Sequence, residues 1–276
     1  MGRKRWRKRL LRGLAAAAAV CLSFWLLQRY WAHRNGRFVP DYPRMELTEQ
    51  TDAETIFLQT GLGKTATARL LEEGELQTIL DAQEALFDPP PERCVPLLGW
   101  FTREDRLVSV GPPLVDLRPG DILLTLSTHT AGWRHGHAGL VIDGDAVLEC
   151  ALLGQDSRLT DVEHWNTYSS YAVLRVQGTE KELGQSVADY ATEHLLDVPY
   201  RLTIGLWGEK EADPDSAGFG LHCIYLPWYA WKQFGYDLDG DGGRVVTAQD
   251  LLRSDLLEVV QVYGLDPGLF LRGRPE

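Results

Sequence analysis

The chain has 276 residues, and 44% of them are hydrophobic, with nine Trp and ten Tyr, which excludes wholesale disorder and is ample for a packed core. This length allows one sizeable domain with appendages, or two small domains. The net charge of −11 is unevenly spread, because the first 37 residues carry ten Lys or Arg and no acid, leaving 18 basic residues against 39 acidic ones. The chain after residue 37 is therefore strongly acidic and repels phosphate backbones, so we expect no nucleic-acid partner.

The N-terminal end combines a basic cluster with the apolar run from Leu14 to Leu27. A cleaved signal peptide and a lipoprotein signal at Cys21 are alternatives, but neither has a well-formed processing site. We therefore expect a basic cytoplasmic end over 1–12 and a transmembrane signal anchor over 13–32, with the bilayer as a partner. The positive-inside rule then predicts a single-pass cell membrane protein whose remaining chain is extracytoplasmic.

The cysteines bear on this expected location. Outside the membrane, Cys94, Cys150 and Cys223 form an odd number, so at least one thiol is unpaired within the chain. A disulfide between Cys94 and Cys150 with Cys223 free is one arrangement for an oxidising compartment. The spacing leaves the connectivity open.

Two segments are expected ahead of the main domain. Residues 33–53 are polar and contain Pro40 and Pro43, which is typical of a tether. Apolar side chains at helical spacing then predict a helical segment over 54–114, with regular helix ending before the three prolines at 89–91.

A domain of class α+β is expected over 115–265, followed by a tail over 266–276. Apolar runs predict strands at 122–126, 138–142, 146–152, 171–176 and 258–263. Helices are predicted after the capping-box patterns Thr179-x-x-Glu182 and Thr247-x-x-Asp250, and from Cys223 to Phe234.

Three side chains are candidates for chemistry. Cys223 is placed at a helix start, where free N–H groups and the helix dipole lower a thiol pKa and can stabilise an oxyanion. His137 heads an apolar strand between Gly136 and Ala138, and Glu149 is a single acid inside another apolar strand, where its charge needs a partner. Taken singly, such residues are more often structural.

Strand register connects two of these residues. If the loop between their strands has three residues (143–145), Ile142 faces Ala146 and Glu149 lies diagonally to His137 on the same face. A two-residue loop would instead turn Glu149 away. A role for Glu149 in orienting His137 therefore requires a loop of odd length.

The ordered set of motifs resembles a known family. It consists of Gly120-Asp121-Ile122-Leu123, then His137-Ala138-Gly139-Leu140-Val141-Ile142, then Glu149, then His222-Cys223 before a helix. Over roughly 118–240 this set is similar to the permuted NlpC-like papain-fold cysteine hydrolases of the YiiX/YebB-like group. The resemblance implies a papain-like domain with an antiparallel sheet and a triad in which Cys223 attacks an amide or ester, His137 transfers the proton and Glu149 fixes the imidazole.

Further residues follow from this resemblance. The step Val198-Pro199-Tyr200 resembles a family segment near the active site, so Tyr200, with His222 and His135, is a candidate for a pocket or oxyanion role. His135 shares strand parity with His137 and is an alternative base. Ile224 stands where the family commonly has a serine, which is a departure at the oxyanion site.

The expected function is that of a membrane-anchored, extracytoplasmic cysteine hydrolase, an amidase or peptidase that works through an acyl-thioester. Its expected substrates are peptides or acyl-amides, such as cell-wall peptides or acylated proteins, and no metal or cofactor is expected. One alternative is a non-catalytic cell-envelope binding module on the same scaffold. Another is a zinc hydrolase whose ligands come from His129, His135, His137, His222 and Cys223, although no familiar metal spacing is present.

Two further patterns imitate ligand-binding motifs. Gly61-Leu62-Gly63-Lys64-Thr65 lacks the first glycine of a phosphate loop and is discarded. Asp237-x-Asp239-x-Asp241-Gly242 matches the first half of a calcium loop, but position twelve is Ala248 rather than Glu. We interpret it as a solvated turn, with calcium left open if Asp250 or a backbone carbonyl completes the site.

Overall fold

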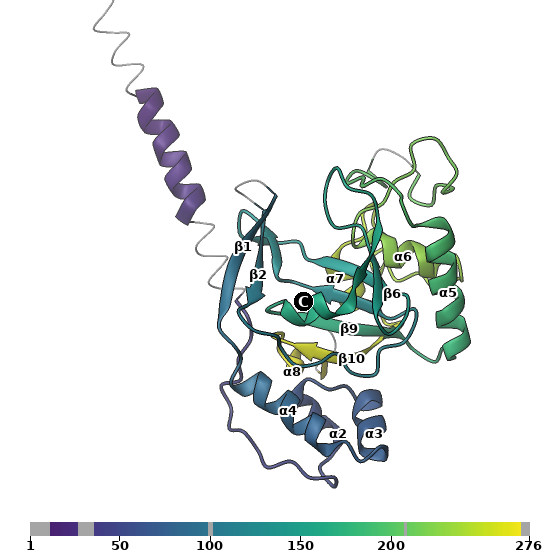
Figure 1. Ribbon diagram of the computed structural model, residues 1–276. Helices are drawn as coiled ribbons and strands as arrows, with labels where there is room; N and C mark the ends of the chain where they lie inside the picture. Colours follow the sequence, from purple (N-terminus) through teal and green to yellow (C-terminus); the bar gives the residue numbers. More distant parts are fainter. Residues whose placement is uncertain (1–11, 27–35, 99–101, 207–208, 272–276) are drawn as a thin grey trace, which may run out of the picture.

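The computed structural model describes residues 12–26, 36–98, 102–206 and 209–271, and the main part is built on a six-stranded sheet (Figure 1). The strands lie in the order β10 (Leu257–Tyr263), β9 (Tyr171–Val176), β3 (Ile122–Thr125), β6 (His137–Val141), β7 (Ala146–Glu149) and β8 (Arg158–Asp161). Every neighbouring pair is antiparallel. The α+β class and the antiparallel sheet are thereby confirmed, and each run predicted as a strand forms one of these strands.

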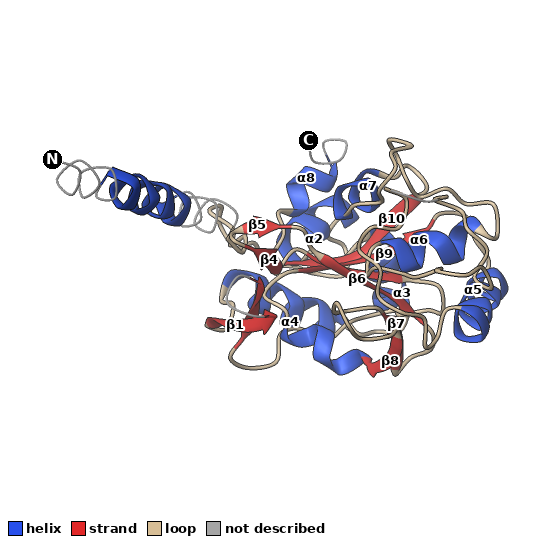
Figure 2. Ribbon diagram, turned by 90° about the horizontal axis from the view of Figure 1, so that it is seen from above, coloured by secondary structure: helices blue, strands red, loops and turns tan. Residues whose placement is uncertain are grey.

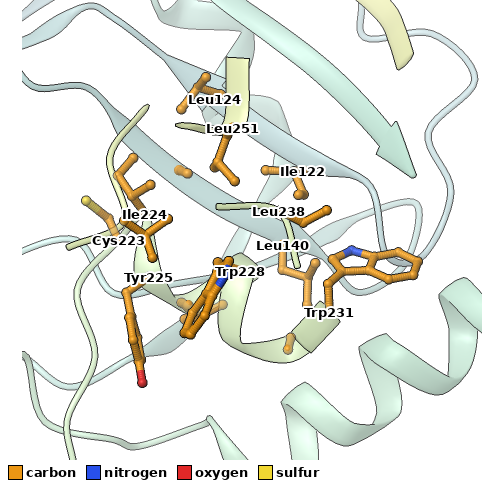
Figure 3. Packing of buried hydrophobic residues seen from close by; sticks show 14 of the residues in the cluster. Ile122, Leu124, Leu140, Cys223, Ile224, Tyr225, Trp228, Trp231, Leu238 and Leu251 are labelled. Carbon is orange, nitrogen blue, oxygen red and sulfur yellow. The ribbon is translucent and has the colours of Figure 1, made fainter. Parts of the chain in front are cut away.

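One face of the sheet is covered by α5 (Lys181–His194), α6 (Tyr225–Lys232) and α7 (Ala248–Arg253). Their apolar side chains share a buried cluster with Ile122 and Leu140 of the sheet. Figure 3 shows Trp228 and Trp231 of α6 beside Leu140. This packing fixes the start of α6, and with it Cys223, against the middle of the sheet.

The two predicted capping boxes have different outcomes. Thr247 and Asp250 form a complete capping box at the start of α7, as predicted. At α5 the N-cap residue is Glu180, and the hydroxyl of Thr179 donates to the carbonyl of Val176 instead, so the capping box predicted there is wrong.

The opposite face of the sheet is covered by α2 (Ala53–Thr60), α3 (Lys64–Glu72) and α4 (Leu76–Phe87), below β9 and β10 in Figure 1. Ile56 and Ile79 are fully buried in one cluster with Val141 and Val173 of the sheet. Gly61 ends α2 with φ 75°, a conformation that glycine adopts without strain. These helices therefore complete the core of the domain, rather than forming a segment in front of it.

A second sheet has the strand order β1 (Glu92–Leu98), β2 (Thr102–Leu107), β4 (Thr128–Thr130) and β5 (Trp133–Arg134). Figure 2 shows this sheet at the end of the molecule opposite α5. The hairpin of β1 and β2 corrects the expectation of a helical segment over 54–114. β1 is largely exposed and interrupted by Pro96, and β2 is mainly charged, so the sequence carries little of the apolar alternation that indicates a strand.

The terminal segments also differ from expectation. Within the predicted tether, the N–H of Phe38 donates to the carbonyl of Gly264 (2.9 Å), and Leu47 is buried. Residues 36–53 therefore pack on the body, while 33–35 lie outside the described residues. The predicted tail contains α8 (Pro267–Leu271).

The expected membrane anchor requires a correction. Of the segment 13–32, the described part belongs to a helix over 12–26, while 27–32 and nearly all of the basic end lie outside the described residues. At about 1.5 Å per residue, this helix is shorter than the roughly 30 Å of a hydrocarbon core. In the portion of the chain that the structure describes, no helix has the length and apolar character needed to cross a bilayer. The predicted anchor and single-pass location are thereby overturned.

Candidate active site

Cys223 lies in the turn that leads into α6, one residue before the N-cap residue Ile224. The N–H of Leu226 donates to the carbonyl of His222 (3.1 Å) within this turn. Pro227 lies in the first turn of the helix, where a missing N–H has no cost. The helix begins at Tyr225, two residues later than predicted, yet the thiol still lies at its positive end. In Figure 3 the sulfur of Cys223 points away from the Trp228 ring.

His137 and Glu149 face each other across the hairpin of β6 and β7. Glu149 pairs with Gly139, and the N–H of Ile142 donates to the carbonyl of Ala146 (2.9 Å). This is the register of a three-residue loop, so the predicted odd loop length is confirmed. Nε2 of His137 lies 2.6 Å from Oε2 of Glu149, and both residues are buried. Because Nε2 is engaged with the carboxylate, Nδ1 is left to interact with Cys223.

Three further side chains hold this pair in place. Thr160 donates to Oε1 of Glu149 (2.5 Å), and Nε2 of His164 lies 3.3 Å from the same oxygen. The ring of Trp165 stacks on His137, with centroids 5.4 Å apart and an interplanar angle of 14°. These residues were missed because β8 and the 3-10 helix Val162–Thr167 carry no clear sequence pattern. The adjacent residues His164 and Trp165 were the sequence feature that could have indicated this part of the site.

The pKa shifts of Cys223, His137 and Glu149 favour a charged pair of thiolate and imidazolium. Burial raises the pKa of Cys223, but its interactions with His137 and, to a smaller extent, His222 outweigh this effect and lower the pKa to about 5. Burial lowers the pKa of His137, yet its interactions with Cys223 and Glu149 raise it to about 10. Burial likewise raises the pKa of Glu149, and its contacts with His137 and His164 hold it well below the usual range. At neutral pH these pKa shifts make Cys223 a thiolate and His137 an imidazolium, and Glu149 is a carboxylate that stabilises the imidazolium.

His222 adds a buried donor next to the sulfur. Its Nδ1 accepts the N–H of Tyr225 (3.3 Å), so the proton of the neutral ring is on Nε2. Within the described residues, Nε2 makes no hydrogen bond of regular geometry, although the ring is close enough to Cys223 to lower the thiol pKa. A buried N–H without an acceptor is a group that a substrate oxygen can satisfy.

Tyr200 is brought to the same place by a short parallel bridge to Leu221. Burial raises the pKa of its hydroxyl, and the nearby charge of Cys223 raises it further. The hydroxyl therefore remains protonated at neutral pH, as a donor must be.

His135, the alternative base, also lines the cavity next to Cys223, but its ring nitrogens have other partners. Its Nε2 is 3.0 Å from the hydroxyl of Thr130, and its Nδ1 is 3.0 Å from the carbonyl of Gly136. Burial lowers its pKa. The structure thus pairs Glu149 with His137 rather than with His135.

A small cavity gives access to the sulfur. Its volume is about 110 Å³, and it is lined by Cys223 and His137 together with side chains of the second sheet, including Leu97 and Glu104. Leu152 and Leu153, which follow the glutamate strand, form another wall. Cys223 is 8% exposed, and this opening gives a reagent access to it.

The remaining cysteines and the zinc alternative can be placed against this geometry. All four cysteines are free, so the Cys94–Cys150 disulfide that the sequence left open is not formed in this structure. Two groups in the described residues bring metal-ligating atoms together, and neither contains Cys223 or His137. The set proposed for a zinc hydrolase therefore does not converge.

No protein-family model, curated protein or solved structure matches the chain.

Proposed function

We propose that this protein is a cysteine hydrolase of papain-like type that cleaves an amide bond through an acyl-thioester on Cys223. The observation that carries the proposal is the buried contact of 2.6 Å between Nε2 of His137 and Glu149, with Cys223 close enough to His137 for each to shift the pKa of the other. An inert structural cysteine has no need of an oriented imidazole backed by a buried carboxylate. The resemblance to the YiiX/YebB-like hydrolases agrees with these roles.

The first half of the reaction forms the thioester. The thiolate of Cys223 attacks the carbonyl carbon, and the carbonyl oxygen becomes an oxyanion that Nε2–H of His222 and the hydroxyl of Tyr200 stabilise. His137, already protonated, gives its proton to the leaving nitrogen as the carbon–nitrogen bond breaks. The amine departs, and the acyl group remains on the sulfur.

The second half releases the acyl group. Neutral His137 takes a proton from a water molecule, and the resulting hydroxide attacks the thioester carbonyl. The carbon–sulfur bond breaks, a carboxylic acid leaves, and the thiolate–imidazolium pair is restored. Glu149 holds the ring orientation through both halves and stabilises its charged form.

The walls of the cavity support a peptide or acyl-amide as substrate. Leu97, Leu152 and Leu153 offer apolar contact close to the sulfur, while Thr102 and Thr130 offer hydroxyl groups. A single acid in this lining, Glu104, is already paired with Arg106 at 2.8 Å. The lining therefore does not present an unpaired charge from Glu104 to the scissile group.

Alkylation at each cysteine as a function of pH tests the activated thiol. With iodoacetamide and mass spectrometry, we expect Cys223 to react with a midpoint near pH 5, because its pKa is lowered to about 5. Cys94 is the matched control, since it is exposed and burial raises its pKa. His137→Ala should move the midpoint of Cys223 upward. Modification of Cys223 no faster than of Cys94 at neutral pH would refute the proposal and favour a binding module.

Acyl transfer tests the chemistry itself. An activated acyl ester should leave one acyl group on Cys223, detectable in the intact mass at short times, because the thiolate attacks before water does. Cys223→Ala should give no adduct, and His137→Ala should form it slowly. An adduct of equal yield in Cys223→Ala would assign the acylation to another residue.

A further inference from the structure

Away from the active site, three carboxylates converge between α6 and α7. Asp239 and Asp241 come from the connection after α6, and Asp250 is the third residue of α7. One oxygen from each lies within 4.8 Å of the others. Asp239 and Asp250 are buried, and Asp241 is exposed. Three negative charges in so small a space repel one another unless a cation lies among them.

The hydrogen bonds of these carboxylates leave one buried oxygen free. Oδ2 of Asp250 accepts from the N–H and hydroxyl of Thr247, and Oδ1 of Asp241 accepts from the N–H of Gly243 (2.7 Å). Among the described residues, Oδ1 of Asp239 has no hydrogen-bond partner, although its side chain is completely covered. A buried, unpartnered carboxylate oxygen is costly and points to a missing ligand.

A lysine side chain already contacts one of these three carboxylates. The ammonium of Lys210 contacts Oδ2 of Asp239 and donates to the carbonyl of Gly243 (2.7 Å). Gly243 is position seven of the half calcium loop that begins at Asp237, the position whose carbonyl binds the metal in such loops. Lys210 thus occupies the place of a metal ion with a single charge opposite three carboxylates.

From these contacts, we propose that Asp239, Asp241, Asp250 and the carbonyl of Gly243 form a calcium site from which Ca²⁺ displaces the Lys210 ammonium. The donors are all oxygen, which favours a hard cation over zinc. Carboxylates and a carbonyl from two different segments give the flexible, high coordination that suits Ca²⁺ better than Mg²⁺. Asp250 supplies the acid that Ala248 lacks at position twelve, because the capping box turns it toward the loop.

The displacement requires little movement of the backbone. The hydroxyl of Tyr225 donates to the carbonyl of Lys210 (2.5 Å) and holds that peptide in place. The Lys210 side chain is partly exposed, so its ammonium can swing into water when the divalent ion arrives.

The test uses the full-length protein after removal of metals with a chelator. Titration with CaCl₂ in a calorimeter should show one ion per chain, with a dissociation constant of about 10⁻⁴ M, as expected for a site with three carboxylates and an internal competitor. Tb³⁺ should give sensitised emission that Ca²⁺ quenches, because the ring of Trp228 lies 4.8 Å from the Lys210 ammonium. Mg²⁺ should compete only weakly.

Three variants separate this site from non-specific binding. Asp241→Asn, at an exposed position, should weaken Ca²⁺ at least about tenfold, whereas Lys210→Met should tighten it about tenfold and make the thermal midpoint depend more strongly on Ca²⁺. Asp237→Asn is the matched control, because its carboxylate accepts from Trp228 and Lys232 instead and the variant should bind normally. Absence of binding in both wild type and Lys210→Met at about 10 mM CaCl₂ would overturn the proposal. Binding unchanged by Asp241→Asn would overturn it as well.

Discussion

Replacing Glu149 with Gln tests whether the carboxylate sustains the charge of His137. The change keeps the size of the side chain but removes a buried charge 2.6 Å from Nε2. A hydrogen bond to a charged group contributes about 1.5–3 kcal/mol. At about 1.36 kcal/mol per pKa unit, its loss should lower the pKa of His137 by about one to two units. The pKa of the imidazole, about 10 in the wild type, should therefore fall to between about 8 and 9.

Nuclear magnetic resonance of protein with ¹³C-labelled histidine measures this pKa directly, and the spectrum of His137→Ala assigns the resonance. Glu163→Gln is the matched control, because Glu163 is an exposed glutamate next to His164 and its loss should leave the titration of His137 unchanged. Identical titrations of His137 in wild type and Glu149→Gln would show that the carboxylate does not act on the ring.

The raised pKa of His137 also determines how the stability of the fold changes with pH. The pKa of His137 is higher in the folded protein than its usual value of about 6.5 in an unfolded chain. Its protonation therefore stabilises the fold fully below about pH 6.5, and this contribution is lost as the pH rises toward 10. The difference in free energy of unfolding between wild type and Glu149→Gln should accordingly shrink as the pH is raised, which urea denaturation across that range can follow. A difference that grows instead would contradict the assignment of the proton to His137.

Other parts of the molecule give three further predictions. Arg175 donates to the buried carboxylates of Asp116 and Asp121, so Arg175→Met should lower the free energy of unfolding in urea by about 3–5 kcal/mol. Gly61→Ala would place a methyl group 2.0 Å from a carbonyl oxygen of β10 at φ 75°, and should cost at least about 1–3 kcal/mol in thermal unfolding. Dialysis against a chelator should leave the alkylation rate of Cys223 at neutral pH unchanged; a loss of reactivity would support the zinc alternative.

The sequence predicted those features that depend on neighbours along the chain. The hairpin of β6 and β7 follows from apolar runs joined by Asp143-Gly144-Asp145, and its register follows from the loop length. The capping box at Thr247 follows in the same way from two residues three positions apart. Local patterns of this kind sufficed to place Glu149 beside His137.

Features that depend on distant partners were not predictable. The hairpin of β1 and β2 lacks apolar alternation, and its place depends on the pairing of β2 with β4, a separate segment of the chain. Thr160 and His164 acquire their role only because β8 pairs with β7. Asp121 and Arg175 lie far apart in the sequence, and no local pattern pairs them, so their buried contact was likewise not predicted.

The separation along the chain of Cys223 from the hairpin has a consequence for biosynthesis. Residues of the β6–β7 hairpin meet early in folding because their contact is local, whereas the sulfur reaches them only after a long intervening stretch has folded. A newly made chain therefore carries an ordinary, weakly reactive thiol. On the function proposed above, Cys223 would become a nucleophile only in the completed tertiary structure, so an incomplete chain would have no hydrolase activity.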